Sequence, residues 1–312
     1  MRRPTPLASP HLIAAMVTPF TTEGAVDTAS LVRLTAYLQQ AGITEFFVAG
    51  STGESPLLDE SDRLRIIENV RGAAPSAVIY AGISGTGHGH AIRNARSAAQ
   101  AGADVVVLMS PYFIALNQEQ LVTYCCTVAD RSPAPVAVYH HVRMPTPFAV
   151  PTIVRLAGHP NLIAIKDTNG GDHNRCAEII AALEGKNFLF LQGVEKLALG
   201  TLRAGGHGCV VAQACIAPWL FRGLVDAWRT GDQPTADRFQ VRIDALWAIF
   251  SRPEVKQSFL HFLRTLKLPL HDRGILASPG CALAHVTFDP AFDDFVREFM
   301  RANLDVKSAN PE

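Results

Sequence analysis

The sequence predicts an α/β protein of the (β/α)8 (TIM) barrel class with a C-terminal helical extension. Eight short apolar runs, rich in β-forming residues, are spaced almost evenly along the first two thirds of the 312 residues. Most are followed by the pattern of an amphipathic helix, and this alternation indicates a parallel sheet with helical crossovers. Eight such units close well into a barrel, whereas an open, doubly wound sheet is the alternative.

The strands are expected where apolar runs are bounded by turn residues, because parallel strands are buried on both faces. They fall at residues 11–20, 45–49, 77–83, 105–110, 136–140, 162–166, 188–192 and 209–213.

Helix signals lie between these runs. Leu31, Leu34 and Leu38 share one helical face, and Gly42 follows as a stop signal. Asp59 and Asn117 each precede an acidic first turn and are expected to be N-caps. Residues 91–101 and 176–183 have helical patterns of similar length.

The β signals stop at Pro218, and helices are expected at residues 219–229, 235–250, 253–266 and 292–302. We therefore divide the chain into residues 1–217, with the barrel strands and their intervening helices, and residues 218–312. The second part comprises the last barrel helix and an extension packed on the barrel or on a partner subunit.

Composition excludes several functions. The 28 basic and 28 acidic residues balance, so no basic excess exists to neutralise phosphates, and we expect no nucleic-acid partner. No run of about 18 apolar residues indicates a membrane span. Prolines interrupt the N-terminus, which argues against a signal peptide. The six cysteines form no CxxC motif and are expected to be reduced core residues of a cytoplasmic protein.

Lys166 is the first candidate catalytic residue. It ends the apolar stretch Leu162-Ile163-Ala164-Ile165, and it is the only one of six lysines that a core strand delivers. An amine at the edge of an apolar core loses hydration of its charged form, which favours the neutral amine that Schiff-base chemistry requires. The alternative is a strand-end lysine that extends its ammonium into water.

Two further strand ends carry candidate groups. The turn Gly50-Ser51-Thr52-Gly53 offers adjacent hydroxyls and backbone N–H groups, which suit a carboxylate, although an ordinary βα turn is the alternative. Tyr139 is either an amphipathic core residue or a general acid/base close to Lys166 on the neighbouring strand.

Nucleotide and metal sites are not indicated. The glycine-rich segment 82–90 follows a strand, but His90 stands where the third glycine of a dinucleotide fingerprint belongs. His140 and His141 are adjacent in a strand and face opposite ways, so they do not suit one metal. We expect neither a metal nor another cofactor.

Taken together, the strand-end motifs resemble those of the dihydrodipicolinate synthase / N-acetylneuraminate lyase family. The resemblance extends from about His11 to the C-terminal helices. It rests on Thr18-Pro19-Phe20, Gly50-Ser51-Thr52-Gly53-Glu54, Pro111-Tyr112, Tyr139, Ile165-Lys166-Asp167-Thr168 and Gly205-Gly206-His207-Gly208.

The resemblance implies a homotetramer, a dimer of dimers, and class I lyase chemistry on pyruvate or another 2-oxo acid. It implies that Lys166 forms the Schiff base, that Tyr139 and Ser51 relay protons, and that Ser51 and Thr52 hold the carboxylate. It also implies that the backbone of Val210 faces the keto acid. Gly50 and Gly193, at strand ends, and His140 and Arg143, in the loop after Tyr139, are further expected substrate contacts.

The chain also departs from that pattern. The synthases carry an arginine five residues after the tyrosine, where this chain has Met144, with Arg143 one position earlier. Many relatives lend a second tyrosine across the dimer interface, where this chain has Phe113.

The sequence therefore predicts a lyase or aldolase that cleaves or forms a C–C bond between a 2-oxo acid and an aldehyde. The alternatives are 4-hydroxy-tetrahydrodipicolinate synthase, a sugar-acid dehydratase using the same imine, and a 2-oxo-acid-binding protein without turnover.

Overall fold

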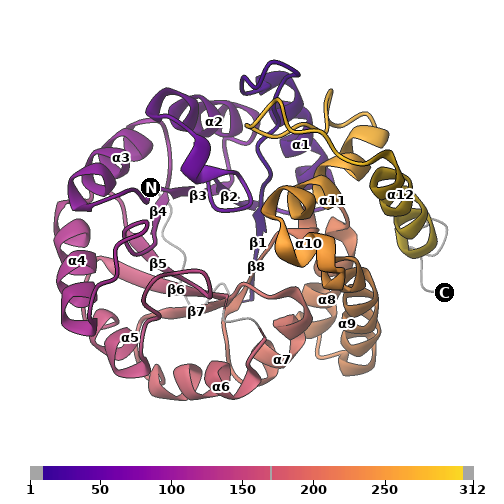
Figure 1. The fold of residues 1–312 in the computed structure, drawn as a ribbon. Coiled ribbons are helices and arrows are strands. Elements are labelled where there is room, and N and C mark those ends of the chain that lie inside the picture. The colour runs from indigo at the N-terminus through magenta and orange to yellow at the C-terminus, as the bar shows by residue number, and fades with distance from the viewer. Residues whose placement is uncertain (1–9, 169–170, 305–312) are drawn as a thin grey trace.

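A computed structural model describes residues 10–168 and 171–304, and within these ranges the strands close into a parallel barrel in the order β1 to β8 (Figure 1). The predicted barrel class is confirmed. The strands are β1 (His11–Ala15), β2 (Glu45–Val48), β3 (Val78–Gly82), β4 (Val105–Leu108), β5 (Val136–His141), β6 (Leu162–Thr168), β7 (Leu189–Gln192) and β8 (Gly208–Val211).

Eight of the described helices surround the strands as an outer ring (Figure 1). They are α1 (Thr28–Gln40), α2 (Glu60–Ala73), α3 (His88–Gln100), α4 (Gln118–Arg131), α5 (Val150–Leu156), α6 (His173–Ala182), α7 (Ala198–Arg203) and α8 (Pro218–Arg229). Asp59 and Asn117 cap α2 and α4 as expected, because their side chains accept the N–H groups of Asp62 and Gln120.

The core has two layers because successive strand residues face opposite sides. Residues such as Ile13, Phe47, Val107 and Leu191 fill the inside of the barrel. The alternate strand residues pack outward against the helices. Because apolar side chains fill the inside of the barrel, polar functional groups are expected at its open end, where the strands reach their carboxyl ends.

The C-terminal extension lies on one side of the ring, beside α1 and α8 (Figure 1). It consists of α9 (Gln233–Trp247), α10 (Pro253–Gln257), α11 (Phe259–Asp272) and α12 (Pro290–Leu304). The expected single helix over residues 253–266 is wrong, since the chain is extended at Ser258. The Ser258 hydroxyl accepts the N–H of His261 and starts a new helix there.

The structure differs from the sequence prediction at the first strand. The first strand was expected to reach residue 20 but ends at Ala15, and the apolar residues beyond it are buried in a connecting segment. The prediction that no signal peptide is present rests mainly on residues 1–9, which lie outside the described residues. No helix in the described part of the chain is long and apolar enough to cross a membrane.

Candidate active site

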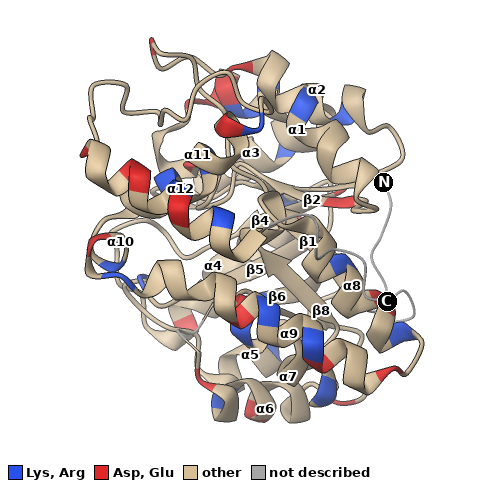
Figure 2. Ribbon diagram, turned by 90° about the vertical axis from the view of Figure 1, so that its right-hand side faces the viewer, with Lys and Arg blue, Asp and Glu red and all other residues tan. Residues whose placement is uncertain are grey.

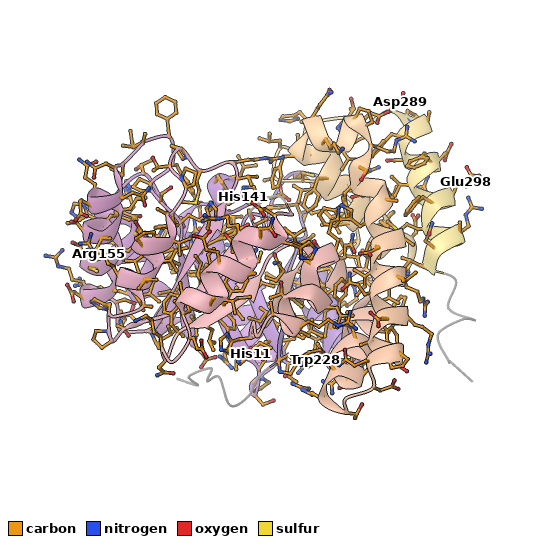
Figure 3. All side chains as sticks on the ribbon, turned by 90° about the horizontal axis from the view of Figure 1, so that it is seen from below. His11, His141, Arg155, Trp228, Asp289 and Glu298 are labelled. Atoms are coloured by element: carbon orange, nitrogen blue, oxygen red, sulfur yellow. The ribbon has the colours of Figure 1, made fainter. Side chains whose placement is uncertain are left out.

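The carboxyl ends of the strands open into a cavity of about 770 Å³. Phe47, Tyr139, Lys166 and Val210 line it from β2, β5, β6 and β8. Figure 3 shows His141, at the end of β5, at the opposite end of the barrel from His11, which begins β1. The sequence-predicted residues therefore gather at the end where barrels of this class carry their active sites.

Lys166 and Tyr139 are direct neighbours across the pair β5–β6 and both point into the barrel. The Lys166 Nζ atom lies 4.1 Å from the centroid of the Tyr139 ring and 5.1 Å from that of Phe47. The two side chains are 5% and 2% exposed. Two aromatic faces thus hold the amine where little water reaches it.

Ser51 joins this pair from the loop after β2. Its Oγ lies 3.2 Å from the Tyr139 hydroxyl, a hydrogen-bond distance at which either oxygen can donate. Thr52 is buried beside it and also lines the cavity. Gly50 begins the turn, and a Cβ there would lie 2.5 Å from the Phe47 ring. The Gly-Ser-Thr-Gly turn therefore brings two hydroxyls to the amine.

Glu54 and Lys267 support this loop from behind. Glu54 has a left-handed backbone (φ 62°), and its carboxylate meets Lys267 Nζ at 2.5 Å. Its other oxygen accepts the N–H of Ala282 at 2.8 Å. Both charged side chains are fully buried. Sequence analysis missed this pair, since Lys267 reads as an ordinary residue of an amphipathic helix.

Gly193 and Val210, which the sequence analysis expected to contact the substrate, also line the cavity. A Cβ at position 193 would lie 2.0 Å from Thr168 Oγ1 and 3.0 Å from Lys166 Cε. The Gly193 N–H donates to the Asp167 carbonyl at 2.8 Å. Glycine is therefore required at the end of β7 to leave space for the lysine.

His140 is not where the sequence analysis expected it. Strand alternation turns its side chain away from the cavity, and its Nδ1 hydrogen-bonds the Asp167 carboxylate on the outer side of the barrel. Its ring also meets Phe148 edge-on. The structure therefore gives His140 a buried structural partner in place of the expected substrate contact.

His141 and Arg143 line the cavity instead. Burial lowers the pKa of His141 to about 4, and the nearby positive charges of Lys166 and Arg143 add to the effect. The Arg143 N–H donates to His141 Nδ1 at 3.1 Å, so the neutral ring carries its proton on Nε2. Arg143 thus lines the cavity, where the sequence analysis expected a substrate contact. Met144 does not, because its side chain is buried and its Sδ accepts the N–H of His141.

Glu195 is a second group that sequence analysis missed. It lines the cavity just after β7, and its Oε1 accepts the N–H groups of Ala212 and Gln213 at 2.9 and 3.2 Å. Burial raises the pKa of this carboxyl, although the backbone donors and Lys166 oppose the rise. The sequence signal that could have identified Glu195 is its position two residues after Gly193, just beyond the end of a predicted strand.

The C-terminal extension closes one side of the cavity with aromatic side chains. These four residues, Trp247, Phe250, Phe259 and Phe262, are called the aromatic wall below. The sequence predicted that the extension packs on the barrel, but gave no sign that it lines the site.

Outside the cavity, the structure shows neither a strongly charged face in Figure 2 nor a metal-binding cluster among the described residues. On the face shown in Figure 2, basic and acidic residues are interspersed. Within residues 10–168 and 171–304, no three His, Cys, Asp or Glu side chains are grouped so that they could hold a metal.

A barrel with a buried lysine, a facing tyrosine and a hydroxyl pair at its strand ends is the arrangement of a class I lyase, in which a lysine amine can act as the nucleophile. The chain belongs to the dihydrodipicolinate synthetase family, whose sequence profile matches residues 8–281.

Individual relatives agree with this assignment. The 4-hydroxy-tetrahydrodipicolinate synthase of Acidiphilium cryptum is 34% identical over 242 residues, which cover 76% of this chain and 82% of that protein. Dihydrodipicolinate synthase from Bacteroides thetaiotaomicron superimposes with a TM-score of 0.86 at 26% identity, over 96% of this chain and 100% of that one. The chloride-inhibited enzyme from Acinetobacter baumannii, solved in complex with pyruvate, gives 0.83 at 26% identity, over 94% and 98%.

Proposed function

We propose that Lys166 attacks the carbonyl carbon of pyruvate and forms an imine, while Thr52 and the turn at Gly50 hold the carboxylate. Tyr139 and Ser51 relay protons. The observation that carries the proposal is the position of the Lys166 amine, 4.1 Å from the Tyr139 ring centroid, with Ser51 Oγ 3.2 Å from the Tyr139 hydroxyl. No metal or organic cofactor takes part, because the protonated imine itself accepts electrons.

The reaction we propose is reversible aldol cleavage of a 4-hydroxy-2-oxo acid. In this direction the Lys166 amine condenses with the C2 carbonyl of that acid, one water leaves, and the protonated imine (iminium) remains. The C4 hydroxyl loses its proton to the Tyr139–Ser51 relay, the C3–C4 bond breaks, and its electron pair neutralises the iminium as an enamine. The aldehyde leaves, and the enamine takes a proton at C3. One water molecule then hydrolyses the imine, which releases pyruvate and restores the Lys166 amine. No oxidant or reductant is needed.

Synthase activity is the second candidate, and the names of the curated relatives favour it. A synthase must hold the carboxylate of aspartate semialdehyde, for which a charge-assisted bidentate pair contributes about 1.5–3 kcal/mol. Met144 is buried in its own loop and offers no such group, while Arg143 faces the cavity one position earlier. We therefore place aldol cleavage first.

Trapping the imine tests the proposal. Incubation with pyruvate and borohydride should add one reduced pyruvyl group to Lys166, and Lys166→Ala should abolish labelling and turnover. Lys196 also lines the cavity and is the matched control, so Lys196→Ala should still be labelled. Labelling at Lys196 would overturn the assignment.

The two candidate reactions are separated by kcat/KM for each, measured side by side. We expect slow condensation of pyruvate with aspartate semialdehyde and faster cleavage of a 4-hydroxy-2-oxo acid. If the semialdehyde reaction is faster by about tenfold, Met144 does not prevent synthase activity, and Arg143 serves as the ligand of the semialdehyde carboxylate.

We further propose a cytoplasmic homotetramer. Phe113, at the position where many relatives lend a tyrosine across an interface, is 95% exposed and has a left-handed backbone (φ 68°). Such a side chain gains by burial against a partner subunit. Analytical ultracentrifugation of the wild type and of Phe113→Asp tests this: a wild-type monomer would refute it.

A further inference from the structure

The cavity extends well beyond the groups that a 2-oxo acid needs. Pyruvate bound to Lys166 as proposed would fill only the end of the cavity near Lys166 and Ser51, whereas the whole cavity measures about 770 Å³ and reaches Phe259 and Lys256 in the C-terminal extension. A volume of this size is typical of a site for a much larger ligand. The remaining space must therefore receive the aldehyde half of the substrate.

The aromatic wall determines the chemistry of that space. Its rings form a chain of contacts, with centroid separations of 5.5 Å for Trp247–Phe250, 5.2 Å for Phe250–Phe262 and 6.0 Å for Phe259–Phe262. Trp247, Phe259 and Phe262 are only half-buried although they line the cavity. Their exposed ring surface is of the kind that an aromatic ligand covers with favourable edge-to-face or offset contacts.

Two polar groups at the same cavity complete the arrangement. His141 has its Nδ1 occupied by the Arg143 N–H, which leaves the Nε2–H as a donor. The His141 ring stands edge-on to Tyr139, with 5.8 Å between ring centroids. The Arg143 guanidinium lies 5.9 Å from the Phe259 ring centroid, at the edge of the aromatic wall. A donor for the aldehyde oxygen and a cation beside an aromatic surface are thus in place.

Resting on the function proposed above, we propose that the aldehyde half of the substrate is an aryl aldehyde, so that C4 of the 2-oxo acid carries an aromatic ring. The ring packs against the aromatic wall, and His141 donates to the oxygen on C4. A sugar-derived aldehyde would need several hydroxyl partners, whereas the side chains that the described part of the extension contributes to the cavity are mostly aromatic, with Ser251 and Lys256 beside them. An amino aldehyde would bring an ammonium toward Arg143, Lys196 and Lys256, which is unfavourable.

The experiment compares two racemic substrates that differ only at C4, 4-hydroxy-2-oxo-4-phenylbutanoate and 4-hydroxy-2-oxopentanoate, by the rate of pyruvate release. We expect kcat/KM to be at least about tenfold higher for the phenyl compound. Because the two compounds also differ in intrinsic reactivity, the decisive quantity is how their ratio changes in variants. Phe259→Ala and Phe262→Ala should each lower the phenyl-to-methyl ratio about threefold to tenfold.

Phe299→Ala is the matched control, since Phe299 is a half-buried phenylalanine of α12 that does not line the cavity. Its ratio should equal that of the wild type. A variant that is merely less stable loses activity toward both substrates together, so the ratio isolates ring contact from folding.

The outcomes separate this inference from the function on which it rests. If borohydride traps pyruvate on Lys166 but the ratio is unchanged in both wall variants, or the methyl compound is preferred, the aryl assignment is wrong and the aldolase proposal stands. If pyruvate is not trapped at all, the proposed function itself fails.

Discussion

Lys267 and Glu54 form a fully buried ion pair that joins α11 to the loop carrying Ser51 and Thr52. The Lys267 ammonium also donates to the Gly280 carbonyl at 2.8 Å and lies 4.7 Å from the centroid of the Phe20 ring. The pair therefore holds the loop after β2, with Ser51 and Thr52, against the C-terminal extension, so that a shift on one side of the cavity affects the other.

Replacing one partner of this pair should be costly. Lys267→Met leaves the Glu54 carboxylate buried without a counter-charge, which typically costs about 3–5 kcal/mol in the free energy of unfolding. Activity should fall as well, because Ser51 and Thr52 lose their support. Urea unfolding measures the first effect, and pyruvate trapping at a folded temperature measures the second.

The control for this prediction is Arg203→Ala, which breaks an ion pair with Asp237 whose two side chains are 44% and 54% exposed. Water screens such a pair, so its loss should change stability far less. Equal effects of Lys267→Met and Arg203→Ala would show that burial does not give the Lys267–Glu54 pair its importance.

Gly193→Ala should lower the activity of the enzyme. The added methyl group would lie 2.0 Å from Thr168 Oγ1, so Thr168 must move, and 3.0 Å from Lys166 Cε, so the lysine must shift by a few tenths of an ångström. Since a displacement of about 1 Å in a catalytic group lowers the rate roughly a hundredfold, this smaller shift should lower kcat by about tenfold. Gly72, at which a Cβ meets nothing within 4 Å, is the matched control in α2. Gly72→Ala should keep full activity and gain up to about 1 kcal/mol of stability.

His141 makes stability depend on pH. Its pKa is about 4 in the folded protein, against 6.5 when the ring is in water. Between these values the unfolded chain binds a proton that the folded protein excludes, so stability decreases as the pH falls from 6.5 to 4. Allowing for the partial exposure of the ring, this group should account for roughly 2 kcal/mol of that loss.

Thermal unfolding between pH 4 and pH 7 tests the His141 prediction. His141→Asn removes the titrating group, so its melting temperature should decline less than that of the wild type over this range. The two proteins should approach the same slope below pH 4, where the ring is protonated in both states. Parallel curves across the whole range would mean that other groups cause the acid sensitivity.

Chelation should not affect the reaction. The imine provides the electron sink that a metal-dependent aldolase obtains from its ion. Prolonged dialysis against EDTA should therefore leave kcat/KM unchanged. A loss of activity that a divalent ion restores would indicate another mechanism.

The sequence by itself determined the barrel and the positions of Lys166, Tyr139, Ser51 and Thr52, because apolar runs, caps and turn residues are local signals. The short helices α5 and α7, of seven and six residues, span too few turns to show helical periodicity. The error at His140 was avoidable, since the alternation that turns Tyr139 inward turns its neighbour outward.

Only the tertiary structure decided the rest of the site. Glu54 and Lys267 are 213 positions apart, and no local pattern shows that two such charges will be buried together. The aromatic wall could not be predicted for the same reason, because Trp247 ends α9, Phe250 follows it, and Phe259 and Phe262 begin α11. Each looks like an ordinary packing residue until these segments are placed over the barrel mouth. Side chains that meet through packing between distant elements depend on the whole arrangement of the core, which the periodicity of a single segment does not contain.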